Sequence, residues 1–170
     1  MENKSQLASE KIIVALDTSS LDHAEMMLKA LHGVIRFYKI GFELFAAHGW
    51  RAVELVRHYN GRVFLDLKFH DIPNTVAKAI AVICRHDVDM VNVHALGGFE
   101  MMKKVHDMVQ SCVELGQKKP LLIGVTVLTS LSDKNLSEEL GISHKIQDQV
   151  LMLAKMVKNA GLDGVVSSPQ

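Results

Sequence analysis

Short runs of apolar residues, rich in β-branched side chains, recur along the chain and are separated by longer stretches of mixed character. Runs of this kind are typical of strands that are buried on both faces of a sheet. The pattern predicts six strands, at residues 12–16, 37–40, 63–67, 90–93, 121–127 and 164–166.

The stretches between these runs carry apolar residues at intervals of three and four, which indicates helices with one buried face. Such faces comprise Leu21, Ala24, Leu28 and Leu31, then Val76, Ala79, Ile80 and Ile83, then Met101, Val105, Met108 and Cys112. Ser20 can cap the first helix and Pro73 suits a first helical turn. Helices should end at Gly33, Gly61 and Gly161. Residues 132–141 are expected to hold a short helix before the one that ends near Ala160.

Strict alternation of strand and helix implies parallel strands joined by right-handed crossovers, which leaves a doubly wound sheet or a β/α barrel. The glycine motif of dinucleotide-binding folds does not occur at the end of the first predicted strand, where residues 14–18 stand instead. Polar residues instead mark the strand ends, where β/α barrels carry their active groups. They are Asp17, Lys39, Asp66, Lys68, Asn92, His94, Thr126 and Thr129. The sequence therefore favours a β/α barrel.

Composition narrows the function class. The 170 residues suit a single domain over residues 11–170, with residues 1–10 as a flexible polar tail. Basic and acidic residues balance at 19 each, so we expect no nucleic-acid partner and no membrane surface. There is no signal-peptide pattern or long apolar run, which favours a cytoplasmic protein. Cys84 and Cys112 lie within helical apolar patterns and are interpreted as core residues.

The segment from residue 64 to 75 carries the most distinctive chemistry. Side chains alternate along a strand, so Asp66 and Lys68 are expected on one face, with Asp71 just past the strand end. Lys39 on the neighbouring strand would complete an array of two lysines and two aspartates. The alternative is a structural salt-bridge network, because such networks also perturb protonation without catalysing a reaction.

A metal site is not expected, although the chain has nine histidines. The spacings typical of zinc sites do not occur. His70 and His94 lie nearest the expected site and are interpreted as structural neighbours. Gly97 and Gly98 are interpreted as a tight turn in preference to an anion site at a helix N-terminus.

Six segments together resemble one known family: residues 14–17, Lys39 with Gly41, and residues 64–75, 91–95, 125–130 and 161–166. In order and composition they resemble bacterial orotidine 5′-phosphate decarboxylases, over about residues 11–170. The resemblance implies a (β/α)8 TIM barrel, of which this chain offers about six strands. It also implies decarboxylation of orotidine 5′-monophosphate to uridine 5′-monophosphate, the last step of de novo UMP synthesis, with no cofactor and no metal.

The resemblance also implies roles for individual residues. Lys68 would be the general acid that delivers a proton to C6 of the pyrimidine, and Asp66 would lie against the departing carboxylate. Lys39 would bond both the ribose and the charged array. Asp17 would bind the ribose.

Four further residues complete the implied site. Asp71 and Thr75 would reach into the neighbouring subunit's pocket, which makes a homodimer with shared active sites the functional unit. Thr129 together with Ser130 would meet the pyrimidine edge.

The chain departs from the family's pattern at its C-terminal end. A complete barrel has eight strands and about 250 residues, and the family's base-closing glutamine and phosphate-gripping arginine would follow residue 170. We therefore expect a fragment of a longer polypeptide. If the chain is complete, we expect an inactive, poorly folded protein with two unpaired strand edges.

Two other functions remain open at this stage. One is a sister decarboxylase that acts on a keto-sugar phosphate and uses Mg²⁺, although residues 69–75 resemble the pyrimidine enzyme. The other is a non-catalytic barrel fragment that retains packing or dimerisation surfaces.

Overall fold

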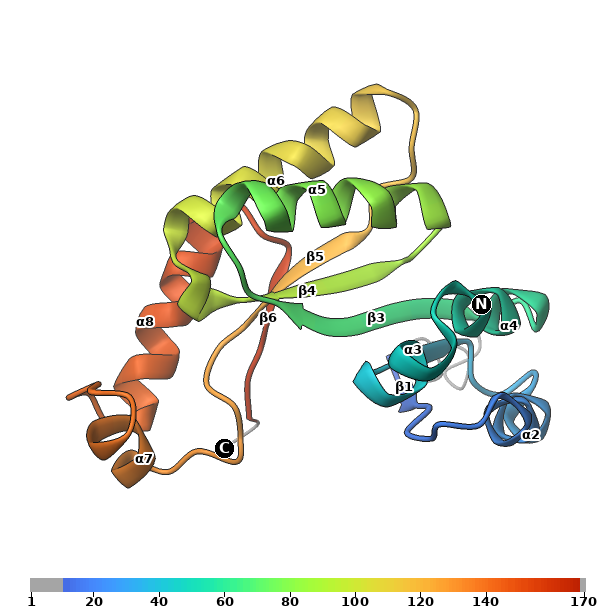
Figure 1. Cartoon of the computed structure of the whole chain (residues 1–170), viewed down its shortest axis with the longest axis horizontal. Coiled ribbons are helices and arrows are strands. Elements are labelled where there is room, and N and C mark those ends of the chain that lie inside the picture. The colour runs from blue at the N-terminus through green and yellow to red at the C-terminus, as the bar shows by residue number, and fades with distance from the viewer. Residues whose placement is uncertain (1–10, 169–170) are drawn as a thin grey trace, which may run out of the picture. The chain divides into compact units, whose positions relative to one another are not determined.

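The computed structural model describes residues 11–168, and the expected flexible tail at residues 1–10 lies outside this range. One six-stranded sheet follows the order of the chain, and the pairs β1–β2, β2–β3 and β5–β6 are parallel (Figure 1). The strands are β1 (Ile13–Ala15), β2 (Phe37–Ile40), β3 (Arg62–Phe69), β4 (Met90–His94), β5 (Leu121–Val125) and β6 (Gly164–Val166). All six predicted strands are present. The structure thus confirms an α/β fold of the β/α-barrel type with six strands.

Helices occupy the connections between the strands. They are α2 (Leu21–Leu31), α3 (Phe42–His48), α4 (Trp50–His58), α5 (Pro73–Ile83), α6 (Phe99–Glu114), α7 (Asp133–Glu138) and α8 (Ile146–Asn159), with short 3₁₀ turns η1 (Cys84–His86) and η2 (Ala95–Gly97). Within residues 11–168, every helix is too short or too polar to cross a bilayer.

Local signals in the sequence set several of the helix ends. The Ser20 hydroxyl accepts a hydrogen bond from the backbone N–H of His23 and caps α2, and Pro73 occupies the first turn of α5. The expected short helix is α7, which begins with a reciprocal capping box between Ser132 and Asn135. These predictions are confirmed because a helix end depends on residues close in sequence.

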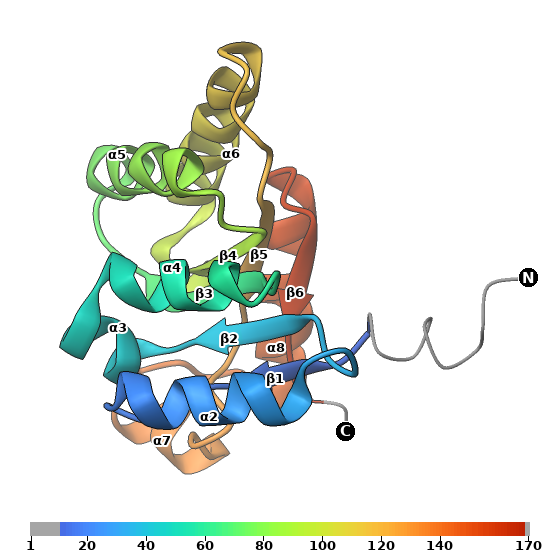
Figure 2. The same ribbon diagram turned by 90° about the vertical axis from the view of Figure 1, so that its right-hand side faces the viewer.

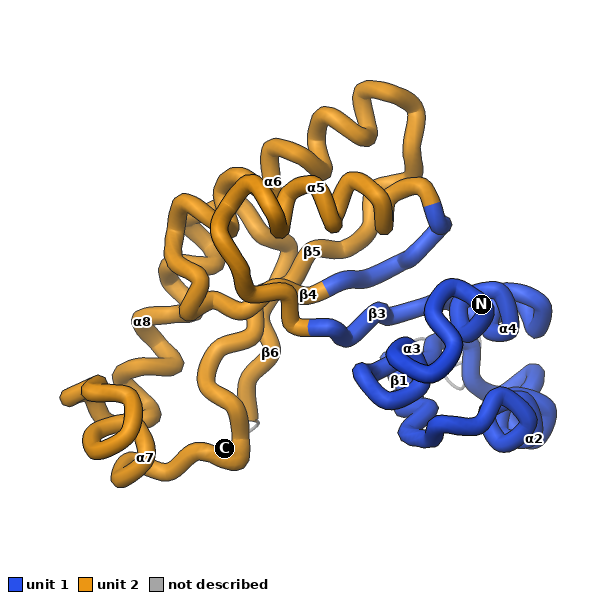
Figure 3. The backbone as a smooth tube through the Cα atoms, in the orientation of Figure 1, with its two compact units in different colours: residues 1–67, 86–91 blue, residues 68–85, 92–170 orange. Residues whose placement is uncertain are grey.

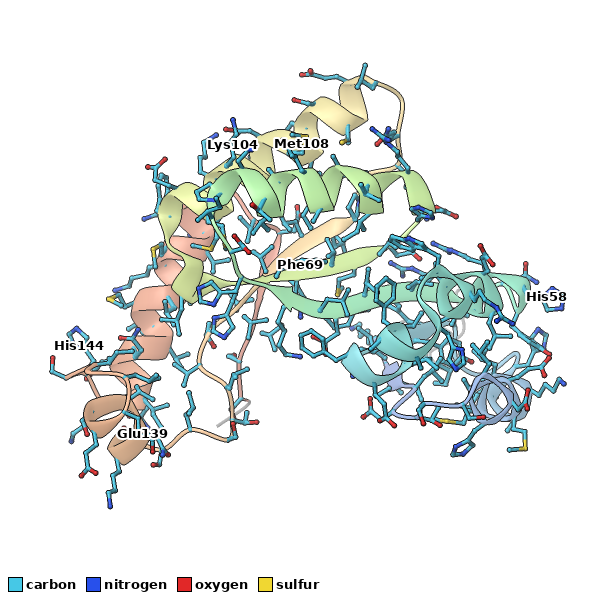
Figure 4. The ribbon with its side chains drawn as sticks, in the orientation of Figure 1. His58, Phe69, Lys104, Met108, Glu139 and His144 are labelled. Carbon is cyan, nitrogen blue, oxygen red and sulfur yellow. The ribbon has the colours of Figure 1, made fainter. Side chains whose placement is uncertain are left out.

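Other boundaries differ from the prediction. The connection between β2 and β3 contains two helices, α3 and α4, because Gly49 between them has a φ of 56° that no right-handed helix can include. β5 ends at Val125 and not at residue 127, and β1 is shorter than residues 12–16. β3 runs two residues further than expected, to Phe69 (labelled in Figure 4).

The chain forms two compact units, which Figure 3 distinguishes by colour. Unit 1 runs to Leu67 and includes His86–Val91, and unit 2 comprises Lys68–Arg85 and the chain from Asn92 on. Both β3 and β4 contribute residues to each unit. A single domain over residues 11–170 stays a prediction.

Each unit has an apolar core built from strand and helix residues. In unit 1, side chains that are at most 2% exposed include Leu16, Tyr38, Ile40, Val56 and Leu65. In unit 2, those at most 1% exposed include Val76, Ile80, Met101, Val105 and Leu153. Helices α5 and α6 of unit 2 pack side by side (Figures 1 and 2).

The two cysteines belong to the core of unit 2, as predicted. Cys84 and Cys112 are buried free thiols. Burial, followed by the nearby Cys112 sulfur, raises the pKa of the Cys84 thiol to about 12. Cys84 therefore stays protonated and unreactive at neutral pH.

A buried carboxylate joins the starts of β3 and β4 within unit 1. Asp89 is 7% exposed, and its Oδ2 accepts from the Val63 backbone N–H at 2.7 Å and from Arg57 Nη2 at 2.6 Å. Arg57 also donates to the carbonyls of Asp87 and Gly61. One aspartate thus fixes a helix and two strands at the edge of the sheet opposite the predicted site.

We expect Asp89→Ala to lower the free energy of unfolding by about 1 to 3 kcal/mol, because it leaves a backbone N–H and a guanidinium without their buried acceptor. Asp107→Ala is the control, since its side chain on α6 is 54% exposed and its ion pair with Lys103 should contribute little to stability. Urea unfolding of both variants measures the difference. Equal losses would show that Asp89 has no special structural role.

Candidate active site

Three of the predicted site residues converge in unit 1. Lys39 Nζ lies 3.1 Å from Asp17 Oδ1 and 3.5 Å from Asp66 Oδ2. The parallel register explains the arrangement, because Ala15 pairs with Lys39 and Lys39 pairs with Phe64, so the ends of β1, β2 and β3 meet at one edge. We call these three residues the ion trio.

Burial differs sharply across the ion trio. The side chain of Asp66 is 11% exposed, that of Lys39 is 24% exposed and that of Asp17 is 71% exposed. A carboxylate as buried as Asp66 requires a compensating charge, whereas Asp17 is well solvated. The trio combines one ammonium with two carboxylates, so it attracts a further cation.

Gly41 keeps the space beside the ammonium open. A Cβ atom at this position would lie 3.3 Å from Lys39 Nζ and 3.9 Å from Asp17 Oδ1. Any larger side chain would crowd the ammonium. The pairing of Lys39 with Gly41 in the sequence therefore has a steric reason.

Lys68 stands out by its backbone conformation. It has a φ of 43°, although β3 continues to Phe69, and its N–H donates to Asn92 Oδ1 at 2.7 Å within unit 2. A left-handed backbone costs a non-glycine residue about 1 to 2 kcal/mol. Strain of this kind clusters at functional sites. It also interrupts regular strand alternation, so the expectation that Asp66 and Lys68 share a face stays a prediction.

Asp71 and Thr75 lie on an exposed segment that leads into α5. Asp71 Oδ1 accepts from the Ile72 backbone N–H at 2.6 Å, and Thr75 lies in the first turn of the helix. Ile72 between them is an apolar side chain that is 67% exposed. A single exposed apolar side chain is common on protein surfaces, so the contact of this segment with a second copy of the chain stays a prediction.

The hydroxyls that follow β5 divide into two kinds. Thr126 is fully buried and its hydroxyl donates to the Val166 carbonyl at 2.8 Å, so it joins β5 to β6. Thr129 and Ser130 are exposed in the turn that follows. Contact of Thr129 and Ser130 with a ligand stays a prediction.

His70 and His94 form a stacked pair at the end of β4. Their ring centroids are 5.3 Å apart, and His94 Nδ1 accepts from the Leu96 backbone N–H at 3.4 Å. Burial, followed by the positive charges of His70 and Lys68, lowers the pKa of His94. A neutral His94 that caps the η2 turn fits the interpretation of a structural neighbour.

Clusters of three or more histidine, cysteine, aspartate or glutamate side chains suited to a metal ion are absent from residues 11–168.

Asn92 is a strand-end residue to which the sequence analysis gives no role in the site. Its signal is a polar residue flanked by Val91 and Val93 in a strand that is otherwise apolar.

Comparison with known proteins places these residues in a family. The model of the orotidine 5′-phosphate decarboxylase / HUMPS family matches residues 10–170. The orotidine 5′-phosphate decarboxylase of Syntrophomonas wolfei is 48% identical over 165 residues, which are 96% of this chain and 69% of that protein. The enzyme of the same name from Carboxydothermus hydrogenoformans is 44% identical over 162 residues, which cover 95% of this chain and 67% of that protein.

Solved structures agree with the sequence comparison. An uncharacterized conserved protein from Geobacillus kaustophilus superposes with a TM-score of 0.86 at 41% identity, over 91% of this chain and 72% of that one. Orotidine 5′-phosphate decarboxylase from Lactobacillus acidophilus superposes with a TM-score of 0.85 at 38% identity, over 93% of this chain and 71% of that one. From its sequence, its β/α architecture and these likenesses, the chain belongs to the orotidine 5′-phosphate decarboxylase family.

Proposed function

We propose that the protein decarboxylates orotidine 5′-monophosphate to uridine 5′-monophosphate without a cofactor. The observation that carries the proposal is the ion trio, in which Lys39 lies between Asp17 and the nearly buried Asp66. Lys68 follows two residues after Asp66 in the sequence and has a strained backbone. The two relatives named above are called orotidine 5′-phosphate decarboxylases, and that name specifies this substrate.

The chemistry of the reaction requires a cation beside C6 of the pyrimidine. The bond between C6 and the carboxylate breaks, CO₂ leaves, and the electron pair stays on C6 in an sp² orbital. A preorganised ammonium stabilises this charge as it develops. In the proposal, Lys68 supplies that ammonium and then donates its proton to C6, and the resulting amine regains a proton from water.

Asp66 has two proposed effects on this step. At about 4 Å and an effective dielectric constant near 20, its repulsion of the substrate carboxylate is about 4 kcal/mol. Enzymes lower barriers by about 8 to 23 kcal/mol, so repulsion alone is insufficient. We therefore propose that Asp66 chiefly orients Lys68 and keeps it charged. The larger part of the lowering of the barrier is then stabilisation of the transition state.

The remaining residues bind the nucleotide. Asp17 and Lys39 would hold the ribose, and Thr129 with Ser130 would meet the pyrimidine edge. Asp71 and Thr75 would enter the site of a second copy of the chain, so the active form would be a homodimer. We expect this homodimer to be cytoplasmic.

We expect Lys68→Ala to lower kcat about 10²- to 10⁴-fold, the range in which a general acid contributes. Lys68→Arg should fail as well, because a guanidinium holds its proton too tightly and is too broad to replace an ammonium. An absorbance assay of orotidylate loss measures both variants. Lys78→Ala, an exposed lysine on α5, is the matched control. Activity of Lys68→Ala within tenfold of an active parent would rule out the assignment.

Mixing two inactive variants tests the shared site. If Asp71 completes the partner's site, a heterodimer of Lys68→Ala and Asp71→Ala subunits contains one intact site. An equimolar mixture should then regain about a quarter of the parent activity after subunit exchange, by the statistics of a two-fold dimer. A mixture no more active than the average of its two components would show that each subunit acts alone.

Metal removal separates the proposal from the Mg²⁺-dependent alternative. Dialysis against a chelator should leave decarboxylation of orotidine 5′-monophosphate unchanged, because the proposed stabilising cation is a lysine. Failure to turn over orotidine 5′-monophosphate, together with chelator-sensitive decarboxylation of a keto-sugar phosphate that Mg²⁺ restores, would favour the alternative enzyme.

A further inference from the structure

The side chain of Asn92 is buried in the middle of an apolar strand. Asn92 is 1% exposed, and its neighbours Val91 and Val93 on β4 are fully buried. An amide in such surroundings is unfavourable unless it forms hydrogen bonds. A buried amide at this position therefore implies a hydrogen bond that a valine could not form.

One hydrogen bond of the Asn92 side chain is unusual for neighbouring strands. Asn92 Oδ1 accepts the backbone N–H of Lys68 at 2.7 Å. In a regular parallel ladder, a backbone carbonyl would accept that N–H. A side-chain oxygen takes this place at the residue where φ is 43°, two residues after Asp66. The distorted backbone of Lys68 and the buried amide of Asn92 thus belong to one arrangement.

We propose that Asn92 is a positioning residue that holds the backbone of Lys68 in its left-handed conformation and so directs the lysine side chain. This proposal rests on the proposed function, in which Lys68 protonates the substrate. The φ angle of a residue sets the direction of its Cα–Cβ bond. A relaxed, extended backbone at Lys68 would send the ammonium in a different direction.

The neighbouring residue on the same face of β4 supports this position. His94 lies two residues further along the strand, so its side chain projects to the same side as that of Asn92. The positive charge of Lys68 contributes to lowering the pKa of His94, so the ammonium acts on the end of this strand.

Removing the acceptor while keeping the size of the side chain tests the proposal. Asn92→Leu deletes the oxygen, and Asn92→Asp keeps one at the same position. Thr126→Val is the matched control, because it removes another buried polar strand-end group of unit 2 that bonds Val166 and not Lys68. Should Asn92→Leu fail to fold, Asn92→Ala takes its place.

The first readout is the Lys68 amide, observed by NMR in the full chain. We expect Asn92→Leu to accelerate its hydrogen exchange and to shift its HN–Hα coupling towards that of an extended strand. Asn92→Asp and Thr126→Val should leave both close to the parent. An unchanged coupling and unchanged exchange in Asn92→Leu would overturn the proposal.

The second readout is kinetic. We expect Asn92→Leu to lower kcat about 100-fold with little change in KM, as a misplaced catalytic group does, and Asn92→Asp to recover most of the loss. A loss in Thr126→Val equal to that in Asn92→Leu would overturn the proposal, because it would indicate a general structural defect. If the parent has no activity, the proposed function fails while the amide readout still decides whether Asn92 holds Lys68.

Discussion

A nearly buried carboxylate at the end of a parallel strand depends on an ammonium beside it. Asp66 is the most buried charge of the ion trio, and Lys39 lies 3.5 Å from it. Removing that neighbour would take away a charge that offsets the cost of burying the Asp66 carboxylate. Parallel strands in chain order bring Asp17, Lys39 and Asp66 to one edge, so the fold itself creates the charged site.

The two ends of β3 use charge for different purposes. At its start, Asp89 bonds the Val63 N–H and Arg57, and these groups are satisfied within the protein. Near its end, Asp66 and Lys39 form an ion pair beside Asp17, whose side chain is 71% exposed. In β/α barrels, conserved chemistry at the first kind of edge serves stability and at the second serves catalysis. The proposed function assigns the same division to the two edges of unit 1.

Much of this fold could be predicted from the sequence, because its signals are local. Apolar runs located all six strands, and Ser20, Pro73 and Ser132 marked helix starts correctly. The convergence of Asp17, Lys39 and Asp66 also followed, since parallel strands align their ends.

Other features could not be predicted, because they depend on residues distant in sequence. The left-handed backbone of Lys68 involves a bond to Asn92, 24 positions away. The break at Gly49 was missed because apolar spacing continues across it. Convergence of Lys68 and Asp71 on the ion trio stays a prediction, as do their roles in catalysis.

In the proposed mechanism, carboxylates hold the ammonium of Lys68 against C6 of the pyrimidine. A crystal structure of the protein with uridine 5′-monophosphate bound tests it most directly. We expect Lys68 Nζ to lie between the Asp66 carboxylate and C6, within hydrogen-bond distance of that carboxylate. A Lys68 side chain that points into solvent, with the nucleotide bound and C6 facing other groups, would contradict it.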